Sequence, residues 1–207
     1  MPEMENTVAA LPLPAGDFKA YLFDLDGTLS DSMPLHLRSW QQATREAGGD
    51  FPLELFWAWG GIPLTRTVEM LNERFGWGLD PAAIVHRKEQ LFLGMIDELK
   101  PIPSVLAHVE AQFGKLPMAI VSGSPHLTIA RSLEVLGLAH YFDTVVGMED
   151  YTHGKPAPEP FLVAAERLGV APGECLVFED AEAGFKSAEA AGMGLVRVPV
   201  PYGADVA

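Results

Sequence analysis

The sequence contains one cysteine and no long uninterrupted hydrophobic run. Cys175 is the only cysteine among 207 residues, so an internal disulfide bond is excluded. Every apolar stretch falls well short of the roughly 18 residues that span a membrane. Residues 1–16 carry Glu3 and Glu5 and lack a basic segment before an apolar one, which argues against a secretory signal and predicts a flexible acidic leader. We therefore expect a cytoplasmic protein.

Basic residues are also scarce. Lysine and arginine number 14 against 28 aspartates and glutamates, which gives a formal net charge of −14. A chain this acidic repels nucleic acid and anionic membranes, so neither is an expected partner. An anionic substrate would have to be attracted locally, by a metal ion and a few placed cations. The hydrophobic content of 48% is that of a globular protein with ample core, and we expect a monomer.

The most informative segment is the short apolar run 21–23 and the residues that follow it. Tyr-Leu-Phe reads as a buried β-strand, and two carboxylates, Asp24 and Asp26, follow it with one leucine between them. Residues two apart on a strand face the same side, so both carboxylates are expected to point into one small volume. Two such charges repel each other unless a cation lies between them or one carboxyl is protonated, and Mg²⁺ is the oxygen-seeking ion that suits them. Gly27 then allows a sharp turn.

The remaining pattern predicts an α/β fold with a helical insert. Asp31-Ser32 offers an N-cap for a helix that runs to about residue 47, and helices at 53–59, 64–75 and 81–99 follow without a strand between them. Beyond residue 100, helices alternate with apolar strands at 118–121, 145–146, 175–178 and 195–198. This predicts a Rossmann-like parallel sheet with helices on both faces, and a small α-helical cap inserted after the first strand. The predicted domains are a core of residues 17–32 and 100–207 and a cap of residues 33–99.

Polar residues follow four of the predicted strands. The carboxyl ends of parallel strands meet at one edge of a sheet, so these residues should converge there. Oxygen ligands, a lysine and exposed amides together can hold Mg²⁺ and a phosphate. In chain order, the residues are Asp24, Asp26, Ser122, Gly123, Ser124, Lys155, Glu179 and Asp180.

These segments resemble the four motifs of the haloacid dehalogenase-like (HAD) hydrolase superfamily. The motifs, in order, are similar to Asp24-Leu25-Asp26-Gly27-Thr28, Ser122-Gly123, Lys155-Pro156 and Glu179-Asp180. The helical block lies where that superfamily inserts a small cap. The chain is most similar to the β-phosphoglucomutase-like branch, which includes sugar-phosphate phosphatases.

The resemblance implies a role for each motif residue. Asp24 would be the nucleophile that forms an aspartyl-phosphate, and Asp26 the general acid and base. Mg²⁺ would be held by the Asp24 carboxylate, the Asp26 backbone carbonyl and Asp180, with Glu179 binding directly or through water. The oxygens of the transferring group would be held by Ser122 and Lys155, with Gly123 and Ser124 beside them.

Four residues of the predicted cap are candidates for substrate binding. His36 resembles a family histidine near the cap hinge, although a lone helical histidine is often structural. Gly61, Arg66 and Lys88 could grip a sugar phosphate, and the alternative for both cations is an ordinary surface charge.

One departure from the family pattern separates two activities. In β-phosphoglucomutases an arginine follows the cap glycine three residues later and holds the second phosphate of the substrate. Here Leu64 occupies that position after Gly61, and the first arginine is Arg66. The pattern is more similar to fructose-1-phosphate phosphatases, so the expected function is Mg²⁺-dependent hydrolysis of a small sugar phosphate such as fructose 1-phosphate. The alternatives are a sugar phosphomutase and a receiver-like domain that only accepts phosphate on Asp24.

Overall fold

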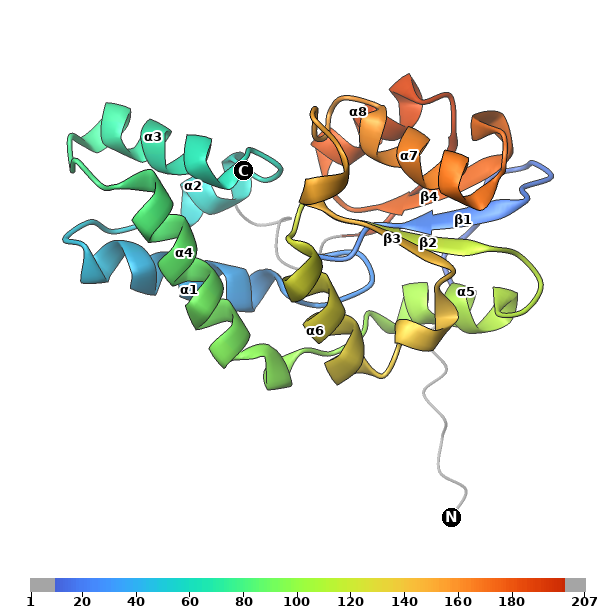
Figure 1. Ribbon diagram of the computed structural model, residues 1–207, viewed down its shortest axis with the longest axis horizontal. Helices are drawn as coiled ribbons and strands as arrows, with labels where there is room; N and C mark the ends of the chain where they lie inside the picture. The colour runs from blue at the N-terminus through green and yellow to red at the C-terminus, as the bar shows by residue number, and fades with distance from the viewer. Residues whose placement is uncertain (1–9, 200–207) are drawn as a thin grey trace, which may run out of the picture.

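A five-stranded parallel sheet forms the centre of the protein. The computed structural model describes residues 10–199, and the leader expected at 1–16 therefore falls mostly outside the described residues. The strand order is β3-β2-β1-β4-β5, with β1 in the middle (Figure 1). The strands are β1 (Ala20–Phe23), β2 (Met118–Val121), β3 (Thr144–Val146), β4 (Cys175–Glu179) and β5 (Gly194–Arg197).

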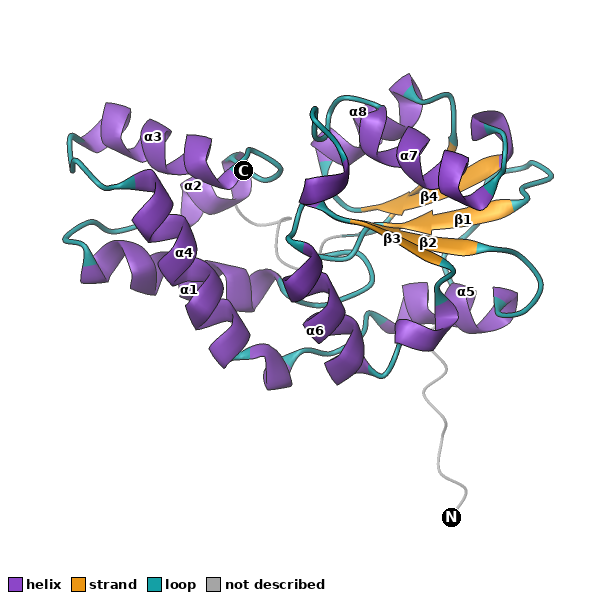
Figure 2. Ribbon diagram, viewed as in Figure 1, coloured by secondary structure: helices purple, strands orange, loops and turns teal. Residues whose placement is uncertain are grey.

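Helices cover both faces of this sheet (Figure 2). Alternate residues of β1 enter opposite layers: Tyr21 and Phe23 join the cluster beneath α5 and α6, and Ala20 and Leu22 join the one beneath α7 and α8. This two-sided burial explains why the strands are apolar throughout. The predicted fold class is confirmed. The flanking helices are α5 (Pro103–Gln112), α6 (His126–Leu136), α7 (Glu159–Leu168) and α8 (Glu182–Ala190).

Helices α1 to α4 form a separate layer at one side of the sheet (Figure 1). Their apolar side chains make their own cluster around Trp40, Phe51 and Leu71, and the tryptophans Trp57 and Trp59 pack against it. The division into two domains with the predicted boundaries stays a prediction. The helices are α1 (Met33–Glu46), α2 (Leu53–Ala58), α3 (Leu64–Phe75) and α4 (Pro81–Gly94).

Two local expectations differ from the structure. The helix expected at 81–99 ends at Gly94. The Met95 N–H then donates to the Phe92 carbonyl, and a short 3₁₀ helix, η1 (Ile96–Glu98), follows. Ser32 is the N-cap residue of α1, but its side chain makes no cap hydrogen bond. The Ser32 hydroxyl donates to the Asp26 carboxylate instead, so this serine binds Asp26 and does not cap the helix with its side chain.

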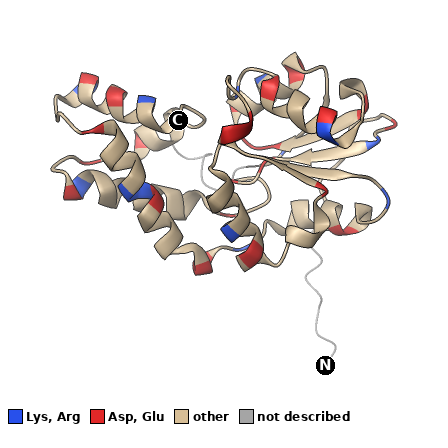
Figure 3. Ribbon diagram, in the orientation of Figure 1, with Lys and Arg blue, Asp and Glu red and all other residues tan. Residues whose placement is uncertain are grey.

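Acidic side chains outnumber basic ones over the whole described part, residues 10–199 (Figure 3). No helix in that range is both long and apolar enough to cross a membrane. The remaining 3₁₀ helices are η2 (Ala139–Tyr141), η3 (Met148–Asp150) and η4 (Pro172–Glu174).

Candidate active site

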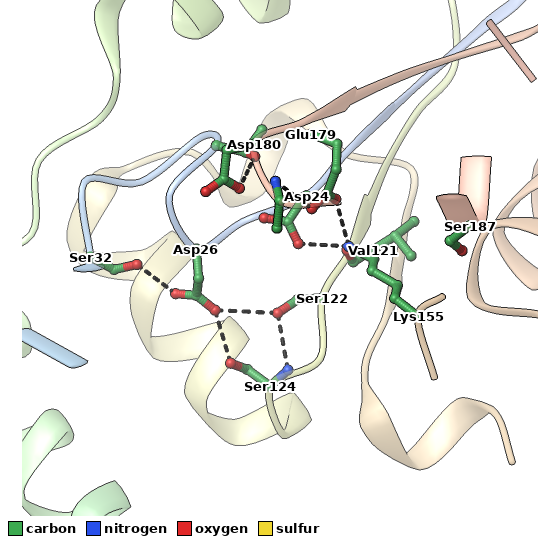
Figure 4. Close-up of polar contacts among 12 residues, drawn as sticks. Asp24, Asp26, Ser32, Val121, Ser122, Ser124, Lys155, Glu179, Asp180 and Ser187 are labelled. Atoms are coloured by element: carbon green, nitrogen blue, oxygen red, sulfur yellow. Dashed lines mark hydrogen bonds and ion pairs between the residues drawn. The ribbon is translucent and has the colours of Figure 1, made fainter. Parts of the chain in front are cut away.

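The carboxyl end of β1 lies between those of β2 and β4, and the motif residues meet there. The side chains of Asp24 and Asp26 have different partners, since Asp24 turns toward Lys155 and Asp26 toward Ser124 (Figure 4). The two carboxylates remain neighbours, since the charge of Asp26 helps to raise the pKa of Asp24, and the expectation that they point toward one small volume stays a prediction. Because β1 ends at Phe23, before either aspartate, strand alternation does not set their directions.

Lys155 joins the ends of three strands. Its ammonium donates to Asp24 Oδ1 and Glu179 Oε2, both at 2.8 Å, and to the Val121 carbonyl at 3.1 Å. The side chain is only 12% exposed. Burial lowers the pKa of the lysine, but the charges of Asp24 and Glu179 outweigh it and raise the pKa above its ordinary value. The lysine therefore points inward, as expected, and stays charged.

Three carboxylates surround one small volume beside this lysine. Ligand oxygens of Asp24, Glu179 and Asp180 all lie within 4.8 Å of one another. Burial and then the charge of Asp24 raise the pKa of Glu179 to about 8 and that of Asp180 to about 7. Burial also raises the pKa of Asp24. One ammonium does not neutralise three carboxylates of which two are buried and one is half-buried. A hard divalent cation with oxygen ligands would, so this donor set fits Mg²⁺.

Two glycines leave room for these carboxylates. A Cβ on Gly27, which has φ of +88°, would lie 2.4 Å from Asp180 Oδ2, and a Cβ on Gly184 would lie 2.0 Å from Glu179 Cδ. The turn at Gly27 was expected from the sequence, whereas Gly184 was not among the predicted site residues. Glycine destabilises a helix, so a glycine near the start of the helix that follows Glu179-Asp180 indicates a close approach of another group. This was the sequence signal for Gly184.

The carboxylate of Asp26 lies in a network of hydrogen-bonding side chains. Oδ1 accepts from the Ser32 hydroxyl at 2.8 Å and lies 3.0 Å from His36 Nε2. Oδ2 accepts from the Ser124 hydroxyl at 2.9 Å and from Ser122 at 3.4 Å. Burial alone would raise the pKa of Asp26, but His36, Ser32 and Ser124 together hold it well below its usual range. Ser32 is a further site residue that was not predicted, because a serine just before a helix is typical of an N-cap.

Two of the candidates from the helical part reach the sheet edge. His36 contacts Asp26 and stacks on Phe92, with ring centroids 4.2 Å apart. Gly61 lies against α8, since a Cβ on it would be 2.9 Å from the Cβ of Ala183. Its φ of +82° also disfavours any other residue. The loop between α2 and α3 thus touches the helix that follows Asp180.

The two candidate cations have different surroundings. The Lys88 side chain is 3% exposed, and its ammonium donates to Glu89 at 2.7 Å. Glu89 also accepts from Thr128 of α6 at 3.0 Å, which ties α4 to the sheet layer. Arg66 instead lies on the exposed side of α3, where it pairs with two glutamates of its own helix, Glu69 and Glu73. The structure thus links Lys88 to α6 through Glu89, and it leaves Arg66 on an exposed side of its helix.

Comparison with known proteins agrees with this geometry. A family model described as haloacid dehalogenase-like hydrolase matches residues 18–192, which include every motif residue described above. The chain belongs to this family. The prediction that it is a hydrolase is confirmed. The matched range also includes helices α1 to α4.

Named relatives of this HAD-like hydrolase include phosphatases and a mutase. It is 37% identical over 182 residues to the fructose-1-phosphate phosphatase YqaB of Escherichia coli, covering 87% of this chain and 96% of that protein. It is 28% identical to the β-phosphoglucomutase of Bacillus subtilis, covering 87% of this chain and 83% of the relative. The crystal structure of a β-phosphoglucomutase from Clostridium difficile has a TM-score of 0.78 at 24% identity, with 87% and 84% of the two chains covered, which shows a shared fold.

Proposed function

We propose that this HAD-like hydrolase is a Mg²⁺-dependent phosphatase of a small sugar monophosphate and works through an aspartyl-phosphate on Asp24. One observation carries the proposal: Asp24 shares a buried carboxylate cluster with Glu179 and Asp180, and Lys155 lies 2.8 Å from it. A carboxylate held beside a cation and a metal-type donor set stays ionised and nucleophilic. The name of the 37% identical relative, a fructose-1-phosphate phosphatase, supports the substrate class.

Mg²⁺ would be held by Asp24, Asp180 and Glu179, together with the backbone carbonyl of Asp26 that the family resemblance implies. Bound there, the ion would offset the charges of the carboxylates and of the phosphoryl oxygens. Lys155 supplies a second positive charge next to Asp24. These two cations would attract an anionic substrate to a chain whose net charge is −14.

The first step of the proposed reaction transfers the phosphoryl group to the protein. A carboxylate oxygen of Asp24 attacks phosphorus while the bond from phosphorus to the sugar oxygen breaks. Asp26 gives its proton to that leaving oxygen, which becomes the sugar hydroxyl. Lys155 and the Ser122 hydroxyl hold the oxygens of the group in transfer, so positioning and charge neutralisation supply most of the acceleration.

The second step releases phosphate from Asp24. A water molecule attacks phosphorus, gives a proton to Asp26, and the acyl-phosphate bond breaks to regenerate the Asp24 carboxylate. The network around Asp26 suits this half of the cycle, since His36, Ser32 and Ser124 favour the ionised carboxylate that acts as the base. Before the first step the same carboxyl has to be protonated, so these contacts must be weaker then than in the second step, when Asp26 acts as the base.

Residues 33–99, with helices α1 to α4, would form a cap that closes the site and selects the substrate. His36, Gly61 and Lys88 are the residues we assign to the substrate side of that cap. His36 contacts Asp26, Gly61 lies against α8, and Lys88 is linked to α6 through Glu89. Arg66 would have to break its ion pairs with Glu69 and Glu73 before it could bind the substrate.

Product analysis tests this proposal. Purified protein with Mg²⁺ is expected to release inorganic phosphate from fructose 1-phosphate, and Asp24→Asn is expected to release none while keeping its fold. Formation of glucose 6-phosphate from β-glucose 1-phosphate would instead support a mutase, the activity named for the 28% identical relative. Stable phosphate on Asp24 without turnover of any ester would support a receiver-like domain.

A further inference from the structure

The loop between β3 and α7 holds two consecutive carbonyls at the end of β2. Lys155 donates to the Val121 carbonyl at 3.1 Å, and the hydroxyl of Tyr151 donates to the Ser122 carbonyl at 3.2 Å. The Ser122 N–H still follows the sheet pattern and donates to Val146, but β3 ends there. The side chain of Tyr151 therefore supplies the donor that the next residue of a longer strand would have supplied.

The contact to the Ser122 carbonyl also fixes the neighbouring amide. A peptide group is planar and trans, so its C=O and N–H point in opposite directions, and holding the Ser122 carbonyl sets the direction of the Gly123 N–H. Within residues 10–199, the Gly123 N–H has no hydrogen-bond acceptor, and Gly123 is exposed. The next amide differs, because the Ser124 N–H donates to the Ser122 hydroxyl at 3.0 Å. One free, oriented N–H thus lies between two serines that contact Asp26.

We propose that Tyr151 is a positioning residue, whose hydroxyl orients the Gly123 N–H toward an oxygen of the transferring phosphoryl group. The inference rests on the proposed phosphatase function and adds to it a residue outside the four motifs. An N–H held in place before the substrate arrives stabilises developing charge without reorganisation during the reaction. Tyr151 acts only through the peptide group that it holds.

The environment of Tyr151 suits a fixed donor. Its ring packs against the apolar cluster beneath α7 and α8, and a Cβ on Gly154 would lie 3.3 Å from its Cε2 atom. Burial raises the pKa of the phenol, so the hydroxyl keeps its proton. An apolar side chain would satisfy the same packing, and only a hydroxyl can also hold the Ser122 carbonyl.

Tyr151→Phe tests the inference, because it keeps the ring and removes the hydroxyl. We expect kcat for fructose 1-phosphate to fall about tenfold with KM changed less than about twofold, since an oriented donor acts mainly in the transition state. The affinity for orthovanadate, used as the probe of the transferring group, should fall by a similar factor. Tyr141→Phe is the matched control, since Tyr141 packs on Phe113 away from the motif loops, and it should leave all three values unchanged.

A second measurement does not depend on turnover. Amide NMR of the wild-type protein should show the Gly123 N–H shifting on addition of orthovanadate, and the shift should shrink in Tyr151→Phe. Both proteins are compared at a temperature at which thermal unfolding shows them fully folded. Wild-type kcat in Tyr151→Phe, or an undiminished Gly123 response, overturns the inference. A wild-type protein that hydrolyses no phosphate ester refutes the proposed function instead, and the Gly123 response then still decides the role of Tyr151.

Discussion

Replacing Asp180 by asparagine should stabilise the metal-free protein at pH 8 although it damages the proposed metal site. Burial and the charge of Asp24 raise the pKa of Asp180 to about 7, from an ordinary value of 3.8. A carboxyl whose pKa is higher in the folded state binds protons more tightly there than in the unfolded chain. Its ionisation therefore lowers the free energy of unfolding as the pH rises from about 4 to about 7. Asparagine has the same shape, still accepts from Thr28, and does not titrate.

The size of the effect follows from the shift in pKa. Each pKa unit corresponds to about 1.4 kcal/mol, so the fully ionised Asp180 lowers the free energy of unfolding by about 4 kcal/mol. At pH 5 the unfolded carboxyl is ionised and the folded one is mostly protonated, which accounts for about 1.7 kcal/mol of this loss. The asparagine variant should thus gain about 2.6 kcal/mol relative to wild type between pH 5 and pH 8. For a chain of this length that is a difference in Tm of about 8 °C.

Urea unfolding at pH 5 and pH 8, in EDTA and in saturating Mg²⁺, measures this effect. Subtracting the wild-type profile removes the contribution of other groups, such as the buried His108, whose pKa burial lowers. Mg²⁺ should stabilise the wild type by about 3 kcal/mol at a hundred times its Kd and stabilise Asp180→Asn far less. Asp97→Asn, at an exposed site in η1, is the control and should follow the wild type. A difference between wild type and Asp180→Asn that does not change with pH would refute the repulsion in this cluster.

Two further predictions concern contacts between the helical part and the sheet edge. His36→Phe keeps the stacking on Phe92 but removes what most lowers the pKa of Asp26, so that pKa should rise. Because Asp26 has to be protonated for the first step, the basic limb of the kcat/KM profile should then move upward by about one pH unit, and an unmoved limb would contradict the pairing. Gly61→Ala should raise KM severalfold, because the new Cβ meets the Cβ of Ala183 at 2.9 Å. Adding Ala183→Gly should lower KM again in the same steady-state assay, but only in part, because the alanine at position 61 still has the strained φ of +82°. Equal KM values for the single and double variants would show that the contact has no effect.

Strands and helices buried on a regular period were predictable from the sequence. The strand expected at 118–121 and the helix expected at 64–75 have the predicted bounds. The strand is apolar throughout because it is buried on both faces of the sheet, and Gly76 ends the helix in a left-handed conformation. The order of the motifs also placed Lys155 beside Asp24, because the ends of parallel strands share one edge.

Contacts that depend on tertiary structure could not be predicted in this way. Ser32 precedes a helix, and its sequence position favours a cap, but the fold brings Asp26 closer than the helix amides. Tyr151 has no motif of its own, and its hydroxyl meets Ser122 only because β3 and β2 are neighbours in the sheet. Arg66 was a candidate ligand for phosphate, but in the structure its guanidinium pairs with glutamates of its own helix. Local patterns fix which residues are buried, whereas partners come from the assembled sheet.

The ammonium of Lys155 is bonded to residues at the ends of three adjacent strands, through Asp24, Val121 and Glu179. Any anion that draws this ammonium toward itself must weaken at least one of the three bonds. Occupancy of the site would then change how readily the neighbouring strand ends open, and amide hydrogen exchange there would report it. The same nitrogen atom that holds these strand ends together would thus act as a built-in sensor of whether phosphate is bound.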